Sequence, residues 1–234
     1  GHNTAVGAKS QLNASTGEFN TSLGSLSMGA GVATGDGNVA LGYKAGIDIT
    51  SGASNILIGY QAGDTISTGN NNIAIGTFAL DSEDGGGHNI AIGRHALGTL
   101  DAGANAKSVA IGYEAGLAMT TGVRNTIIGG LAGDAMTTTS DNVAIGYEAL
   151  TSATIGDGNV AVGNHALYTN VAADRNIAIG YQALYLATAA STVDSYNTAI
   201  GFQAADHITS GVQNTILGGL AGNAINTGDN NIII

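Results

Sequence analysis

The side chains in this sequence that could carry out chemistry are five histidines and seventeen acidic residues. His95 and His165 occupy equivalent positions, in RHAL and NHAL, and in a symmetric assembly they could form rings of imidazoles suited to a transition metal. The same position also holds Lys44, Gln61, Glu114, Glu148 and Gln182, which indicates a solvated face. Asp36, Asp84 and Asp157 lie in Gly-rich turns, where Asp is common, without the longer pattern of calcium-binding repeats. We therefore predict no metal site and no cofactor.

Catalytic patterns are also missing from the sequence. There is no HExxH or phosphate-binding Walker sequence. Solenoid enzymes that cleave polysaccharides need positioned carboxylates, whereas the acidic residues here are scattered through turns without clustering in consecutive repeats. No nucleophile–base pair stands out either. We predict that the chain is not an enzyme.

Composition narrows the possible partners. The formal net charge is −11, which argues against nucleic acid and against an anionic membrane surface. No apolar run is long enough to span a bilayer, so no direct membrane insertion is expected. The chain has 38 Gly and no Pro or Cys, so neither collagen nor a disulfide framework fits.

A five-residue motif repeats along the whole chain. It reads NIAIG at Asn72 and NVAIG at Asn142, and most steps between successive motifs are 17 residues. The motifs start at residues 3, 20, 38, 55, 72, 89, 108, 125, 142, 159, 176, 197, 214 and 231. We number each repeat from the Asn of its motif, as place 1. A β-branched core closed by Gly at place 5 is typical of a strand that ends in a sharp bend.

The repeat length predicts an all-β fold. A unit of 17 residues suits one coil of a parallel β-roll or β-solenoid, with two short strands and two turns, so we expect about 14 short coils in a single repeat domain over residues 1–234. The end coils would expose bare strand edges, so we expect the chain to be a piece of a longer fibre.

Asn stands at place 1 of nearly every coil, with Ser108 as the exception. Stacked amides can hydrogen-bond along the stack, as in the Asn ladders of cross-β assemblies, although such a row could instead bind a ligand or an ion. We favour the structural ladder, formed by Asn38, Asn55, Asn72, Asn89, Asn125, Asn142, Asn159, Asn176, Asn197 and Asn214.

The motif is apolar on both faces of its strand. Places 2 and 4 hold Val, Ile, Leu or Thr, and place 3 is mostly Ala. Because a 17-residue coil has one interior, the second face needs cover from another chain, and a closed homotrimer would supply it. We place the alanines on the face between chains: Ala40, Ala74, Ala91, Ala110, Ala144, Ala161, Ala178 and Ala199. The alternative is a monomeric solenoid with an exposed alanine face.

Two of the complete coils carry Ile at place 3, namely Ile127 and Ile216. In both, place 6 is Gly (Gly130 and Gly219) rather than the more usual Tyr. We interpret this as compensation of volume within one layer of the fold.

The motifs resemble those of a known family. SVAIG at Ser108–Gly112 resembles the YadA-like head repeats of trimeric autotransporter adhesins, and NIAIGYQAL at Asn176–Leu184 is similar to repeats in bacteriophage tail-fibre proteins. The resemblance covers essentially the whole chain. It implies a homotrimeric, left-handed parallel β-roll that displays a binding surface away from the cell or virion. The coils here are longer than the usual head repeat, which favours the phage fibre.

Two coils are lengthened, at Asp101–Lys107 and at about Tyr185–Tyr196. Insertions in repeat proteins often form the binding face, so Tyr185, Leu186 and Tyr196 are the candidate receptor contacts. We expect an extracellular attachment-fibre segment, on a virion or bacterial surface, that spaces and presents contacts for a host or cell-surface glycan or protein. Alternatives are an autotransporter adhesin head, an ice-binding solenoid and a glycan-cleaving fibre enzyme.

Overall fold

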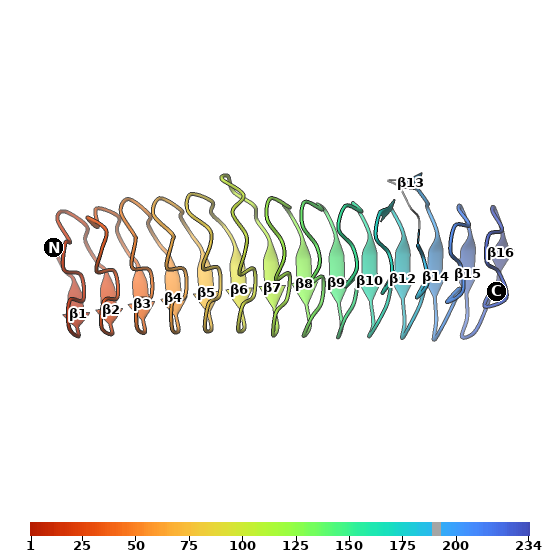
Figure 1. Cartoon of the computed structure of the whole chain (residues 1–234), viewed down its shortest axis with the longest axis horizontal. Coiled ribbons are helices and arrows are strands. Elements are labelled where there is room, and N and C mark those ends of the chain that lie inside the picture. Colours follow the sequence, from red (N-terminus) through yellow and green to blue (C-terminus); the bar gives the residue numbers. More distant parts are fainter. Residues whose placement is uncertain (189–192) are drawn as a thin grey trace. The chain divides into compact units, whose positions relative to one another are not determined.

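The chain folds as an all-β parallel solenoid in the computed structural model, which describes residues 1–188 and 193–234. It divides into two compact units, Gly1–Val123 and Arg124–Ile234. Within each unit, the strand of one coil lies beside the strand of the next in chain order (Figure 1). The described ranges contain no helix. The predicted all-β parallel solenoid is therefore confirmed.

Each motif forms one short strand at places 2 to 4. In the first unit the strands are β1 Thr4–Val6, β2 Thr21–Leu23, β3 Val39–Leu41, β4 Ile56–Ile58, β5 Ile73–Ile75, β6 Ile90–Ile92 and β7 Val109–Ile111. In the second unit they are β8 Thr126–Ile128, β9 Val143–Ile145, β10 Val160–Val162, β12 Ile177–Ile179, β14 Thr198–Ile200, β15 Thr215–Leu217 and β16 Ile232–Ile233. A separate pair joins β11 Ala173–Asp174, at the end of the preceding coil, to β13 Val193–Asp194, within the second lengthened coil.

The register between strands follows the repeat. In β5 and β6, Ile73 pairs with Ile90, one coil further along the chain. The lengthened coils keep this register, since Ile90 pairs with Val109 and Ile177 pairs with Thr198. The extra residues are therefore accommodated in the turns and leave the strand rows unbroken.

The remainder of most coils is turn, so the expectation of two strands in every coil is wrong. Non-glycine residues adopt left-handed backbone angles at the same places in successive coils, for example Gln61 with φ 52° and His95 with φ 55° at place 7. Such residues cannot continue a strand. Backbone hydrogen bonds still join neighbouring coils in these turns, as from the N–H of Gln61 to the carbonyl oxygen of Tyr43 (3.0 Å).

The Gly at place 5 meets two demands at once, as Gly76 illustrates. Its φ is +134°, a value that L-residues rarely adopt. A side-chain carbon built on it would lie 2.5 Å from the carbonyl oxygen of Gly93, the equivalent residue of the next coil. Stacked coils touch backbone to backbone at this bend, so only Gly fits.

The interior of each coil is narrow and is filled mainly by small side chains. Place 3 and place 8 point inward, and from the coil of Asn20 to the coil of Asn197 they are closed to solvent. A larger residue at place 9 or place 12, such as Leu80, Leu97, Ile66 or Met136, completes the layer and is also fully buried. The core is thus made from the chain's own coil, without a second chain.

The assignment of the alanine row to a face between chains is corrected by this burial. The eight alanines assigned to that face are at most 1% exposed in one isolated chain, because their side chains project into the interior of the coil. These residues are Ala40, Ala74, Ala91, Ala110, Ala144, Ala161, Ala178 and Ala199. The outward face of the strand belongs to places 2 and 4.

The proposed compensation between places 3 and 6 is also wrong. Place 6 lies outside the coil, where Tyr43 and Tyr60 are exposed, so its size does not affect the core. Compensation involves place 9 instead. A side-chain carbon on Gly63 would lie 2.8 Å from both Leu57 Cδ2 and Ile66 Cδ1. Gly at place 9 therefore makes room for a large residue at place 3 or 12.

Candidate functional site

The Asn residues at place 1 form a continuous hydrogen-bond ladder within each unit. Asn72 shows the pattern: its Oδ1 accepts from the backbone N–H of Asn89 (3.0 Å), and its Nδ2 donates to the carbonyl oxygen of Gly86 (2.9 Å). The ten asparagines of the expected ladder are all buried. The ladder residues are Asn38, Asn55, Asn72, Asn89, Asn125, Asn142, Asn159, Asn176, Asn197 and Asn214. The amides hold neighbouring coils together and are enclosed by them.

Asn89 departs from this pattern. Its Oδ1 accepts from the N–H of Ser108 (3.1 Å), but its Nδ2 is buried without a hydrogen-bond partner. The coil that starts at Asn89 is the first lengthened one, and its extra residues alter the turn that supplies the carbonyl elsewhere. The insertion therefore interrupts one of the two ladder bonds.

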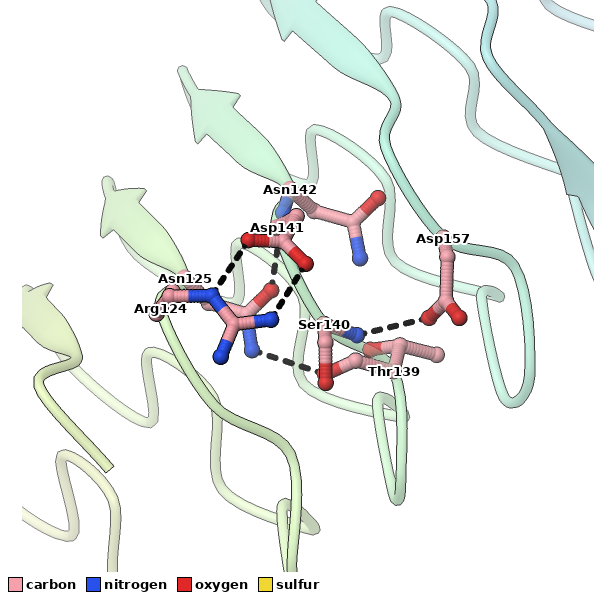
Figure 2. A network of polar contacts seen from close by, with 7 residues as sticks. All are labelled: Arg124, Asn125, Thr139, Ser140, Asp141, Asn142 and Asp157. Carbon is pink, nitrogen blue, oxygen red and sulfur yellow. Dashed lines mark hydrogen bonds and ion pairs between the residues drawn. The ribbon is translucent and has the colours of Figure 1, made fainter. Parts of the chain in front are cut away.

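A second ladder runs along the turn just before each Asn, and Figure 2 shows part of it in the second unit. The carboxylate of Asp157 accepts from the backbone N–H of Ser140 (2.7 Å), one coil earlier. Asp174 accepts from the N–H of Asp157 in the same way (2.7 Å). Asp36 does so for Glu18 in the first unit (2.7 Å). These acidic residues cap the backbone of the neighbouring coil.

Beside this ladder, Arg124 makes a two-pronged ion pair with Asp141, at 2.6 and 2.7 Å (Figure 2). The guanidinium holds the pKa of the Asp141 carboxyl below its usual range. Arg124, Asp141, Gly158 and Arg175 occupy place 17 of successive coils. Because Gly158 has no side chain, a polar pocket of about 290 Å³ lies at this point of the row. The pocket is lined by Asp141, Asp157, Gly158 and Arg175.

Two polar residues occupy place 12, where the core elsewhere is apolar. Glu83 is fully buried and accepts from the N–H of Gly86 (2.7 Å) and of Ala102 (3.4 Å), a residue of the first insertion. Burial raises the pKa of Glu83. Asn170 is also buried, and its Oδ1 accepts from the N–H of Ala173 (2.9 Å). Each precedes a lengthened coil, so both are turn anchors that the sequence reading missed.

A short acidic row lies on the first unit. Burial and the nearby charge of Asp64 raise the pKa of Asp81 to about 6. Burial and the same Asp64 charge also raise the pKa of Asp48. Within residues 1–188 and 193–234, no three His, Cys, Asp or Glu residues gather as a metal site would require.

The strands present two rows of side chains outward: the row at place 4 is Val, Leu or Ile throughout, and the row at place 2 is Val or Ile in most coils and Thr in the others. Places 2 and 4 alternate with the buried place 3, so their side chains share the opposite face of the sheet. Ile56 and Leu41 are 38% and 40% exposed in the first unit, and Ile177 and Ile179 are each 38% exposed in the second. Exposed apolar rows that run through consecutive strands are characteristic of an interaction surface.

The second unit also carries an aromatic patch, built on the bend that follows the strands. Its centre is His165, whose Nε2 lies 3.1 Å from the Glu148 carboxylate. Four tyrosine rings lie around it at centroid distances of 5.4 to 6.4 Å. The patch consists of Tyr147, His165, Tyr168, Tyr181, Tyr185 and Phe202.

The three predicted receptor contacts have different surroundings. Tyr185 belongs to the aromatic patch, where it stacks on Tyr168 (5.1 Å). Leu186 is half-buried beside it. Tyr196 is exposed, with its hydroxyl 3.1 Å from Asp194 and the Arg175 guanidinium over its ring. Residues 189–192 of the same predicted insertion lie outside the described residues.

Comparison with known proteins identifies no relative. No family model, no curated protein and no solved structure matches the chain. Across the described residues, we find no helix with the length and apolarity needed to cross a membrane. The functional interpretation therefore depends on the surfaces described above.

Proposed function

We propose that this chain is a structural and adhesive segment of an extracellular attachment fibre. In this proposal, copies of the chain associate through the outward strand face, and the remaining surface contacts a receptor on a host or cell. The fibre belongs to a virion or a bacterial surface, and the segment has no catalytic role. The resemblance of its motifs to YadA-like and tail-fibre repeats supports this class of protein.

The observation that carries the proposal is the pair of apolar rows at places 2 and 4. The interior is already filled, so these side chains have no partner within their own coil. Fully burying an Ile is worth about 1.5–3 kcal/mol, so covering the exposed part of each is worth about 1 kcal/mol. Several coils with two such side chains each reach the order of 10 kcal/mol per chain, enough to offset the cost of association.

A second copy of the same chain is the best match for this surface. Its repeat presents rows with the same spacing, so side chains of facing coils meet at every level. In an assembly with closed rotational symmetry, every copy contributes the same two rows, at places 2 and 4, to the contact. The family resemblance favours three copies, which would enclose all the outward rows around one axis.

Sedimentation velocity and native mass spectrometry test the proposal directly. The chain is expected to be trimeric, and the double substitution Ile177→Asp with Ile179→Asp to shift it toward monomer. Ile155 is 46% exposed but lies outside the strand rows, so Ile155→Asp is the matched control and should leave the trimer intact. A monomeric parent chain, or a double variant that associates as well as the parent, would overturn the proposed assembly.

A further inference from the structure

The polar pocket beside the second ladder lies where a row of charged side chains has a gap. Arg124, Asp141, Gly158 and Arg175 adopt left-handed backbone angles at place 17 of consecutive coils, with φ between 58° and 67°. The first heavy atom that a side-chain carbon on Gly158 would meet is the Cγ of Arg175, at 3.6 Å. The space over Gly158 is therefore open, and it forms the pocket of about 290 Å³.

Two carboxylates form one side of the pocket, and bonds to residues outside the pocket hold both in place. Asp141 is paired through both oxygens with Arg124, at 2.6 and 2.7 Å. Asp157 accepts from the backbone N–H of Ser140 (2.7 Å), as Figure 2 shows. A carboxylate has about four lone-pair sites on its two oxygens, so each of these groups can accept further hydrogen bonds.

Arg175, one coil beyond Gly158, forms the other side of the pocket. Its guanidinium pairs with the Asp194 carboxylate and lies over the Tyr196 ring, with 5.9 Å between the guanidinium carbon and the ring centre. These contacts fix the side chain beside the pocket. A guanidinium has five N–H donors, which is more than the pair with Asp194 uses, so donors remain for a ligand.

We propose that this pocket binds one neutral sugar unit of a glycan receptor through neighbouring hydroxyls. A hydroxyl donates to a carboxylate and accepts from a guanidinium, so a pair of hydroxyls matches both sides of the pocket. Ligand pockets usually have volumes of about 300–1,000 Å³. The pocket over Gly158 is at the lower limit of this range, which suits a single sugar ring.

The charges around the pocket oppose ionic ligands. Arg124 neutralises Asp141, and Asp194 neutralises Arg175, whereas Asp157 is bonded to a backbone N–H. An acidic sugar would bring its negative charge beside the two carboxylates, and a cation would lie beside the Arg175 guanidinium. A neutral ligand that both donates and accepts hydrogen bonds avoids both repulsions.

The pocket also lies on the edge of the second unit that carries the second insertion. β11 Ala173–Asp174, which directly precedes Arg175, pairs with β13 Val193–Asp194 inside the lengthened coil. Tyr196, one of the predicted receptor contacts, is 49% exposed beside Arg175. The inference rests on the proposed attachment function and narrows its receptor to a neutral glycan.

The first unit contains the same Asp–Gly turn without the arginine wall. Asp36 accepts from the N–H of Glu18 (2.7 Å), and Gly37 has φ +69°. The residue over Gly37 is the uncharged Ser54, whose Oγ would lie 3.8 Å from a side-chain carbon built there. Substitution of Gly37 is therefore a matched control for substitution of Gly158.

Affinity electrophoresis through gels that contain mannan, galactan or dextran tests the inference, with polygalacturonate as the acidic counterpart. At least one neutral polysaccharide should retard the chain, and polygalacturonate should not. Gly158→Asn should abolish the retardation, because Asn tolerates left-handed backbone angles and its side chain fills the pocket. Gly37→Asn is the matched control and should bind like the parent. Asp157→Asn keeps an acceptor for the Ser140 N–H but removes the charge, and it should weaken binding about tenfold.

Retardation by none of the neutral polysaccharides would overturn the inference, as would equal binding by the parent and Gly158→Asn. If circular dichroism shows that Gly158→Asn has lost its fold, unchanged binding by Asp157→Asn overturns it instead. Calorimetric binding of spermidine to the parent but not to Gly158→Asn would assign a cationic ligand and also overturn it. Sedimentation of the same samples keeps the two proposals separate. A monomer that is retarded contradicts only the assembly, and a trimer that is not retarded contradicts only the sugar site.

Discussion

Substituting Asn72 by Ala should destabilise the first unit more than the same change at Asn89, one coil further on. Asn72→Ala removes the acceptor of the Asn89 N–H and the donor to the Gly86 carbonyl, and both of these groups are buried. Leaving a buried polar group unpaired costs about 1–3 kcal/mol, so the expected loss is about 2–6 kcal/mol. Asn89→Ala removes only the bond from the Ser108 N–H, for about 1–3 kcal/mol.

Urea unfolding followed by circular dichroism, at matched protein concentration, gives both free energies of unfolding. Amide hydrogen exchange gives a local measurement, because the Asn89 N–H should exchange faster in Asn72→Ala, where its acceptor is gone. The two substitutions delete the same atoms at equivalent buried places, so differences in side-chain volume cancel. Equal losses, or a larger loss in Asn89→Ala, would refute the view that the bond from Asn72 Nδ2 to the Gly86 carbonyl adds to the stability given by the bond between coils.

Two further outcomes are expected for the first unit. Gly103→Ala, with φ +61° and open space around it, should cost about 1–2 kcal/mol in urea unfolding. Gly76→Ala should cost clearly more than that, because the new methyl also meets the Gly93 carbonyl, and a similar loss in both variants would contradict the close stacking. The folded chain holds the Asp81 proton more tightly than the unfolded chain, since its pKa rises from 3.8 to about 6, so stability from this group is present below pH 3.8 and is lost as the pH rises to about 6. Thermal midpoints between pH 4 and 6 should therefore vary less in Asp81→Asn than in the parent chain, and an unchanged slope would contradict the effect.

Much of the architecture could be read from the repeat, because a stacked fold imposes the same requirement on every coil. The place-5 glycines signalled a bend that proved to be a backbone contact, as at Gly76 and Gly93. The Asn at place 1 signalled a row of stacked amides, and the structure shows their partners to be mostly backbone groups, in the next coil for Oδ1 and in the same coil for Nδ2. Each place has the same environment in every regular coil, so its structural requirement appears in the sequence as the same residue type at a fixed interval.

The repeat did not show in the same way which face of the strand lies inside the coil. Both faces are apolar, so alternation shows that they differ but not which one lies inside. The size of the interior decides this, since it is narrow enough that Ala144 and Ala149 are both fully enclosed. The small residues at places 3 and 8 were the available clue. Glu83 and Asn170 also left a signal, as polar residues at a place that is otherwise apolar.

The direction of the ladder bonds has a consequence for how such a chain changes length during evolution. In regular coils the Oδ1 of the Asn accepts from the following coil and its Nδ2 donates to the end of its own coil, so every regular junction uses the same bonds. Duplicating or deleting a whole repeat therefore creates a junction identical to those already present. Inserting only part of a repeat does not create such a junction. In the first lengthened coil, for example, the Nδ2 of Asn89 is buried without a hydrogen-bond partner. The number of coils can therefore change by recombination, one whole coil at a time, with little loss of stability.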